Sequence, residues 1–174
     1  MPTEVTATPL PLQDLLTRAS HQLLKQADEI INRELLTSDG IEYRIAVVLA
    51  HAACDLQTEE AIGELVAIRD VEYLREAMLM TRKVNLGDER ARRVYQALSG
   101  DSPWLLVNGV RRAPWWDDWT TCAEKRDRVA HRGENVTVEE ADASVKACKS
   151  YVNHLINVVT DVRSKHRLRT GTLA

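Results

Sequence analysis

The stretch that decides the fold is residues 137–162, TVEEADASVKACKSYVNHLINVVTDV. It opens with Thr137 and Glu140, the T-x-x-E pattern of a capping box, in which each side chain bonds the backbone N–H of the other residue. Apolar residues then alternate at spacings of three and four, as on one face of an α-helix: Val138, Ala141, Val145, Cys148, Val152, Leu155, Val159 and Val162. The pattern predicts a long C-terminal helix whose seam packs inside its own domain or against a second chain.

The preceding segment predicts a helix with two well-marked ends. Pro114 suits the first helical turn, where a missing backbone N–H leaves nothing unpaired. Gly133 suits the position after the last turn, where the backbone often becomes left-handed. We therefore expect this helix to end close to His131 and Arg132.

Apolar periodicity also predicts helices nearer the N-terminus. One is expected over residues 12–36 and a second over 41–66, separated by the Thr-Ser-Asp-Gly breaker at 37–40. Residues 71–99 are expected to hold two shorter helices. Residues 104–107 are expected to form an apolar loop rather than a strand, because no partner strand is evident.

These elements predict an all-α fold, namely a single helical bundle of about five to six helices with a long C-terminal helix. The length of 174 residues suits one domain. We expect a flexible N-terminal lead-in at 1–11, a helical domain at 12–166 and a basic flexible tail at 167–174.

Composition narrows the class of protein. No apolar run approaches the roughly 20 residues that cross a bilayer, and the acidic start Met1–Glu4 is unlike a signal peptide. We therefore expect a cytoplasmic protein with no membrane partner. The scattered Cys54, Cys122 and Cys148 predict reduced, packed thiols. A formal net charge of -3 argues against an overall basic nucleic-acid binder but leaves local basic patches open.

Residues 126–131, Arg-Asp-Arg-Val-Ala-His, carry the clearest chemistry. An arginine keeps its charge in proteins, so Arg126 suits binding a phosphate or offsetting charge in a transition state rather than acting as a base. An imidazole readily accepts and returns a proton near neutral pH, which makes His131 the candidate proton shuttle. The pair suits phosphodiester cleavage that needs no metal or cofactor.

Helix geometry limits what one copy of this pair can do. Five residues along an ideal helix rotate the second side chain by about 140° from the first. Arg126 and His131 therefore do not aim at one atom unless the helix end is distorted. A second copy of the motif, related by a two-fold axis, would complete the site.

The segment 124–133, Glu-Lys-Arg-Asp-Arg-Val-Ala-His-Arg-Gly, resembles the R-x4-H signature of HEPN domains. In that family the residue after the arginine is commonly polar, and Asp127 fits. The motif lies near the end of one helix, before a loop and a long closing helix, as it would here. Residues 50–56, Ala-His-Ala-Ala-Cys-Asp-Leu, also look like the small apolar run with an acid on an upstream helix.

The resemblance implies a metal-independent endoribonuclease that works as a homodimer. The RNA 2′-hydroxyl would attack the adjacent phosphate in a cleft between two motifs. In that cleft His131 would handle protons, Arg126 would bind the scissile phosphate, and Asp127 would orient a motif group or the neighbouring backbone. Asp55 is an additional candidate, as an acid that holds Arg126. The flanking cations that would contact RNA are Lys125, Arg128 and Arg132.

Such proteins often serve as toxins, phage-defence effectors or RNA-processing factors, so a cognate inhibitor or an effector complex is a further expected partner besides RNA. In HEPN toxins silenced by a nucleotidyltransferase antitoxin, a tyrosine typically lies two places after the histidine. Gly133 stands there in this chain, so that mode of control is not expected. Two alternatives stay open: a catalytically silent HEPN module that dimerises or binds RNA or protein, and an unrelated helical regulator with an accidental Arg–His pair.

Other residues allow more than one interpretation. Arg111 and Arg112 precede a run of tryptophans that would either stack on bases or fill the core, namely Trp115, Trp116 and Trp119. The role of Trp104 is open in the same way. The basic run 163–169 would either follow RNA phosphates or be a solvated terminus. His51 and Asp55, one helical turn apart, are expected to form a satisfied pair rather than a metal site.

Overall fold

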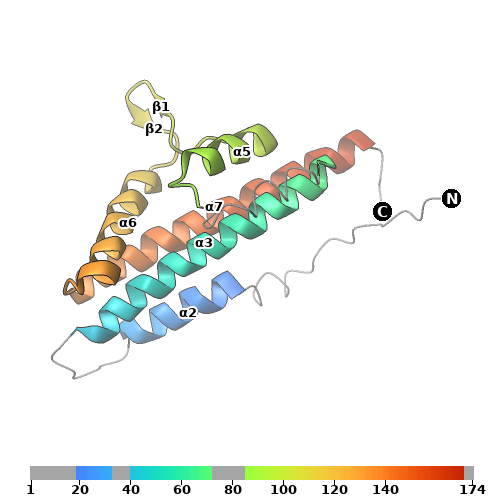
Figure 1. Ribbon diagram of the computed structural model, residues 1–174. Coiled ribbons are helices and arrows are strands. Elements are labelled where there is room, and N and C mark those ends of the chain that lie inside the picture. Colours follow the sequence, from blue (N-terminus) through green and yellow to red (C-terminus); the bar gives the residue numbers. More distant parts are fainter. Residues whose placement is uncertain (1–18, 33–39, 72–84, 171–174) are drawn as a thin grey trace.

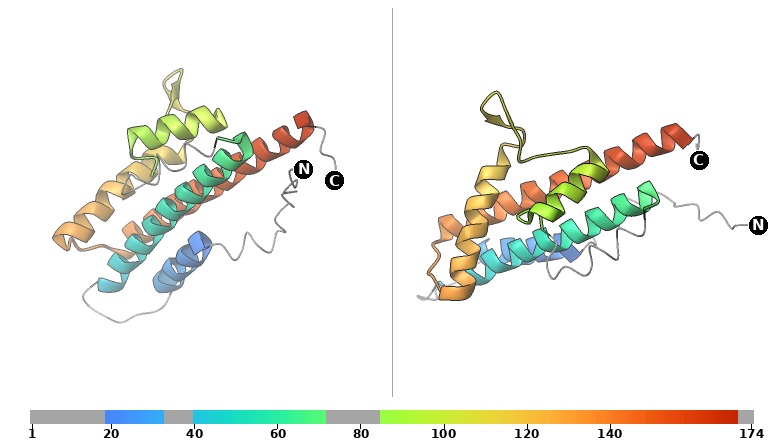
Figure 2. Two further views of the ribbon diagram at one scale, coloured as in Figure 1. Left: turned by 45° about the vertical axis from the view of Figure 1, so that its right-hand side comes forward. Right: turned by 45° about the horizontal axis from the view of Figure 1, so that its top comes forward.

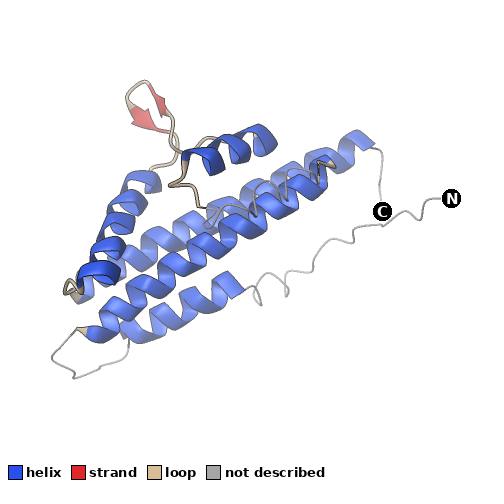
Figure 3. Ribbon diagram, in the orientation of Figure 1, coloured by secondary structure: helices blue, strands red, loops and turns tan. Residues whose placement is uncertain are grey.

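The chain folds into a bundle of α-helices with one small β-hairpin (Figure 1, Figure 3). The computed structural model describes residues 19–32, 40–71 and 85–170. The described helices are α2 (Ala19–Asn32), α3 (Ile41–Arg69), α5 (Glu89–Ser99), α6 (Trp115–Arg132) and α7 (Val138–Thr170), and the strands are β1 (Leu106–Val107) and β2 (Val110–Arg111). The predicted all-α class is confirmed, as is the long C-terminal helix, since α7 runs for 33 residues.

The two longest helices, α3 and α7, lie side by side and run in the same direction through the bundle (Figure 2). Small side chains on α3, among them Ala50, Ala53 and Cys54, are fully buried and let the two helices approach closely. The face of α7 that they meet is the predicted seam, whose buried members are Ala141, Val145, Cys148, Val152, Leu155, Val159 and Val162. The seam therefore packs inside the domain and not against a second chain.

The start of α7 confirms the predicted capping box. The backbone N–H of Glu140 donates to Oγ1 of Thr137 at 3.2 Å, and the backbone N–H of Thr137 donates to Oε2 of Glu140 at 3.0 Å. These two bonds satisfy donors that the first turn of a helix would otherwise leave without a partner.

Replacing Thr137 with alanine is expected to lower the free energy of unfolding by about 1 kcal/mol, because one of the two capping bonds is lost. Chemical denaturation followed by circular dichroism measures this change. Glu139→Ala is the matched control, since it removes a carboxylate from the same turn without removing a capping bond. An unchanged stability of Thr137→Ala would show that the bond to Thr137 Oγ1 does not stabilise the helix start.

Helix α6 packs against α7 and α3 and carries residues 126–131 at its C-terminal end (Figure 1). Both of its predicted ends are confirmed. Pro114 directly precedes the first residue, and Gly133 follows the last one with a φ of 64°, a left-handed conformation that glycine adopts without a steric penalty. Two of its tryptophans, Trp116 and Trp119, are each only 3% exposed and belong to the core, while Trp115 is half-buried.

The prediction of a loop at residues 104–107 is wrong for its second half, because Leu106 and Val107 form strand β1. This strand pairs in antiparallel register with β2, Leu106 opposite Arg111 and Val107 opposite Val110. Asn108 and Gly109 form the connecting turn with φ values of 52° and 80°. An Asn-Gly pair in this conformation is the strongest short-range signal for a hairpin, so the partner strand lies only two residues away.

The predicted tail from residue 167 is wrong up to Thr170, because α7 continues to that residue. Within this added turn, the hydroxyl of Thr170 donates to the carbonyl oxygen of His166 at 3.2 Å. The lead-in predicted at 1–11 and the first of the two short helices predicted within 71–99 lie outside the described residues. None of the described helices combines the length and the apolar character that crossing a membrane requires.

Candidate functional site

The residues of the R-x4-H motif lie on the last two turns of α6 and differ sharply in exposure. His131 is exposed to solvent and has no hydrogen-bond or ion-pair partner in the described part of the chain. The side chain of Arg126 is only 18% exposed, and its Nη1 lies 3.1 Å from Oδ1 of Asp127. Nε of Arg126 is buried with no hydrogen-bond partner among the described residues. The rest of the guanidinium is partly exposed and carries further N–H donors, so Arg126 retains capacity to bind an anion.

The two acids of the predicted site, Asp127 and Asp55, lie in different places. Asp127 pairs with Arg126, with its own side chain 62% exposed. Asp55 is half-buried on α3, and no ion pair joins it to Arg126 within the described ranges. Burial raises the pKa of the neighbouring Cys54 thiol, and the charge of Asp55 adds to that rise. Asp127 is thus the acid that holds Arg126 in this structure.

Lys125 and Arg128, both predicted to contact RNA, are bound to acids of the same chain. Nζ of Lys125 lies 2.7 Å from Oε1 of Glu134 and 2.9 Å from Oε1 of Glu140, while Nε of Arg128 lies 2.9 Å from Oε2 of Glu134. The hydrogen bond to Glu134, followed by that to Glu140, raises the pKa of Lys125. This network ties the end of α6 to the loop and to the start of α7. Of the three flanking cations, Arg132 is the one that this network leaves exposed.

Arg44 of α3 fixes the end of α6 from the other side. Its Nη1 donates to the carbonyl oxygen of Gly133 at 3.1 Å, which gives a terminal carbonyl of the helix a charged partner. The same arginine lines an apolar groove of about 440 Å³ between the start of α3 and the last turns of α6. The other groove residues are Ile41, Ile45, Val48, Leu49, Val129 and Ala130. Three of these are large apolar residues that are unusually exposed, namely Ile41 at 49%, Ile45 at 46% and Val48 at 40%.

The predicted pairing of His51 with Asp55 is replaced by a contact with the neighbouring helix. Nε2 of the buried His51 lies 3.4 Å from Oγ of Ser144 on α7. Cys54 and Cys148 are buried beside this pair as free thiols, and Sγ of Cys54 lies 3.9 Å from the carbonyl oxygen of Cys148. Cys122 is also a free thiol and is half-buried.

Within the described residues, no group of three or more histidine, cysteine, aspartate or glutamate side chains is arranged to hold a metal ion. Comparisons with protein-family models, with curated proteins and with solved structures find no match for this chain. The residues that the sequence did not reveal are Arg44, Glu134 and Glu140. Their contacts with α6 join residues 89, 9 and 15 positions apart, spacings to which no local pattern applies.

Proposed function

We propose that this chain is a metal-independent endoribonuclease of the HEPN type, which cleaves RNA in a cleft between the motifs of two copies, in a toxin–antitoxin or phage-defence setting. The observation that carries the proposal is the contrast between the two motif residues. His131 is exposed and unpaired in the described part of the chain, whereas Arg126, about 1.4 turns earlier, is mostly buried and paired with Asp127. A proton shuttle and an anion-binding cation at one helix end are the groups that such cleavage needs.

The chemical step requires only these groups and the RNA itself. The 2′-hydroxyl of one nucleotide loses its proton to an imidazole, and its oxygen forms a bond to the adjacent phosphorus. The bond from phosphorus to the 5′-oxygen of the next nucleotide breaks, and that oxygen takes up a proton from an imidazole. The products are a 2′,3′-cyclic phosphate and a 5′-hydroxyl. Arg126 offsets the negative charge that builds on the phosphate oxygens.

The apolar groove supports the dimeric form of the proposal. Ile41, Ile45 and Val48 expose large apolar side chains next to the turn of α6 that carries Ala130 and His131. Contiguous exposed apolar surface of this kind marks an interaction site. A second copy that covers this groove with its own would bring two α6 ends together across a two-fold axis, and each cleft would then receive groups from both chains.

The network around Lys125 favours a second candidate, a catalytically silent HEPN module that dimerises or binds a partner. Lys125 and Arg128 are neutralised by Glu134 and Glu140, which leaves the motif with less positive charge than its sequence indicates. A reduced positive field weakens attraction of RNA phosphates. The two candidates differ in whether RNA is cut.

The deciding experiment incubates the purified protein with a mixture of single-stranded and tRNA-like RNAs in the presence of a chelator. We expect cleavage that leaves 2′,3′-cyclic phosphate ends, and about 10²- to 10⁴-fold slower cleavage by His131→Ala, because a general acid–base group is lost. Identical background cleavage by the wild-type and His131→Ala proteins would rule out catalysis by this motif. Dimerisation without cleavage would favour the silent module.

A further inference from the structure

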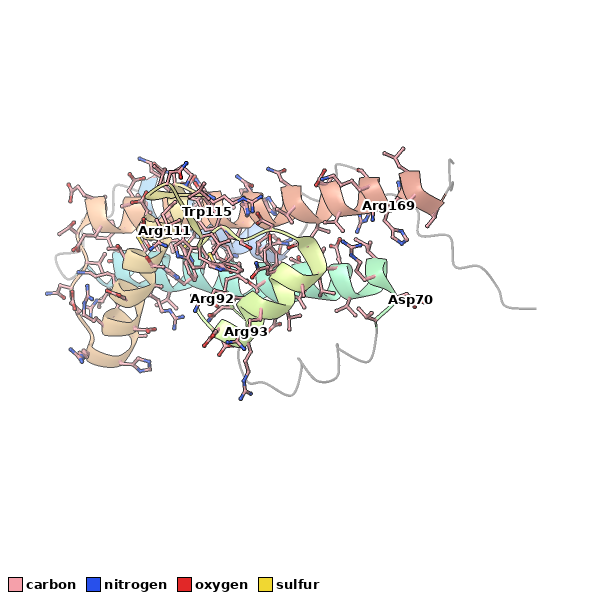
Figure 4. The ribbon with its side chains drawn as sticks, turned by 90° about the horizontal axis from the view of Figure 1, so that it is seen from above. Asp70, Arg92, Arg93, Arg111, Trp115 and Arg169 are labelled. Carbon is pink, nitrogen blue, oxygen red and sulfur yellow. The ribbon has the colours of Figure 1, made fainter. Side chains whose placement is uncertain are left out.

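A second surface lies at the opposite end of α6 from the motif. A pocket of about 420 Å³ opens between α5, the β-hairpin and the start of α6. The lining residues that carry its chemistry are one acid, three arginines, an amide and an indole, namely Glu89, Arg92, Arg93, Arg111, Gln96 and Trp104. Figure 4 shows Arg92 and Arg93 on α5 and Arg111 on the neighbouring hairpin. Segments separated in the sequence thus bring three guanidinium groups and an indole to one pocket.

Trp104 supplies a fixed aromatic ring on the wall of this pocket. The ring packs against two buried aromatic residues, with centroid distances of 6.3 Å to Tyr95 and 5.7 Å to Trp116. The guanidinium carbon of Arg92 lies over the ring, 5.9 Å from its centroid. Trp104 is only half-buried, and the exposed part of its side chain lines the pocket. An indole beside a planar cation is a surface on which a nucleobase stacks.

The three arginines differ in how firmly they are held. Arg111 is fixed, because its Nε lies 2.8 Å from Oδ1 of Asp117 and its Nη1 donates to the carbonyl oxygen of Trp104 at 2.7 Å. Arg93 pairs with Glu89 at 2.6 Å, but both side chains are more than 60% exposed, and such a pair is weak. Arg92 has no acidic partner within the described residues. Arg92 and Arg93 are therefore able to bind a phosphate at little cost.

We propose that this pocket binds one nucleotide unit of single-stranded RNA, with the base stacked on Trp104 and Arg92 and the phosphate held by Arg92 and Arg93. The assignment of RNA as the ligand rests on the proposed ribonuclease function. An acidic peptide would satisfy the arginines but offers no flat face to the indole, whereas a nucleotide satisfies both. The amide of Gln96 adds a donor and an acceptor toward a base edge.

The position of the pocket suits a site that holds RNA while the motif cuts it. Trp115 and His131 are sixteen residues apart on α6, which corresponds to about 24 Å along the helix axis. A strand bound in the pocket is long enough to reach the motif after a few nucleotides. The pocket therefore acts as a binding site outside the cleft, which raises affinity without taking part in the chemistry.

The test measures binding of a fluorescein-labelled single-stranded RNA by anisotropy, in a His131→Ala background that prevents cleavage. Arg92→Ala is expected to weaken binding about tenfold, as the loss of one stacked and ion-paired contact does. The matched control is Arg90→Ala, which removes one exposed arginine of the same helix outside the pocket and is expected to change binding less than twofold. Arg92→Lys keeps the positive charge but loses the planar guanidinium group. Its affinity for RNA is therefore expected to lie between those of Arg92→Ala and Arg90→Ala.

Further measurements distinguish stacking of a base from charge alone, and an RNA strand from a free nucleotide. RNA is expected to quench the tryptophan fluorescence of the Arg90→Ala protein, and an abasic oligonucleotide of equal charge is expected not to do so. Equal RNA affinities for Arg92→Ala and Arg90→Ala, with unchanged melting temperatures, would overturn the proposal. Binding of adenosine monophosphate without binding of RNA would overturn the assignment to a strand. RNA that binds through Arg92 but is not cut by the wild-type protein would refute the nuclease function and leave this binding site standing.

Discussion

Mixing the Arg126→Ala and His131→Ala variants is expected to restore RNA cleavage that neither variant supports alone. The two positions are about 140° apart on the helix, and the structure leaves His131 exposed while Arg126 is mostly buried. If each cleft takes His131 from one chain and Arg126 from the other, a mixed dimer has one cleft with both groups intact. Random pairing makes half of the dimers mixed, so about a quarter of wild-type activity is expected to return.

The measurement compares initial cleavage rates of each variant, of their equimolar mixture and of wild type, after unfolding and refolding together to exchange subunits. Each variant alone is expected to be about 10²- to 10⁴-fold slower than wild type. The control mixes His131→Ala with the double variant, which has no intact cleft in any pairing and is expected to recover nothing. Absence of recovery in a sample shown to contain mixed dimers would place both groups of each site in one chain.

Trp119→Ala is expected to lower the free energy of unfolding by about 3–5 kcal/mol, the usual cost of removing a buried tryptophan side chain. Trp119 is 3% exposed at the centre of an aromatic cluster. Its ring stacks on Tyr151 with centroids 4.7 Å apart and an interplanar angle of 28°, and it lies 5.0 Å from the ring of Trp116. Removal of this side chain leaves a cavity between α6 and α7, and urea denaturation measures the loss.

Trp119→Phe separates packing from hydrogen bonding at the same position. Nε1 of Trp119 is buried and points to no nitrogen or oxygen acceptor among the described residues, and its interaction with the Cys54 thiol is a weak one to sulfur, so its removal costs little hydrogen bonding. A phenyl ring keeps most of the stacking on Tyr151, and we expect a loss of under half that of the alanine variant. A phenylalanine variant as unstable as the alanine variant would show that the indole makes a contact beyond packing.

Local signals predicted the parts of the fold that depend on neighbouring residues. The capping box of Thr137 and Glu140 and the caps at Pro114 and Gly133 lie within a few positions of the helix ends that they mark. Such interactions form within one turn, so the sequence contains all of their components. The hairpin at Asn108 and Gly109 has an equally local signal, but a strand of two residues is too short for its apolar pattern to mark it as a partner.

The charge state of the candidate site was not predictable in this way. Lys125, Arg128 and Arg132 are equivalent cations in the sequence, and all three were expected to contact RNA. The loop after Gly133 returns Glu134 to Lys125 and Arg128, and the first turn of α7 brings Glu140 to the same lysine. Gly133, in the left-handed conformation, sets the direction in which the chain leaves α6, and that direction brings the two glutamates to the cations. The amino-acid composition of the segment does not indicate this direction.

The sequence by itself determined that this protein is helical, where α6 begins and ends, where α7 begins, and which motif to test for function. These features follow from periodicity and from bonds within single turns. The tertiary structure alone decided that Arg126 is mostly buried, that an apolar groove reaches Ala130 next to His131, and that Arg92, Trp104 and Arg111 share a pocket. Each of these depends on how separate helices pack, because burial and electrostatic pairing are set by groups that are distant in the chain.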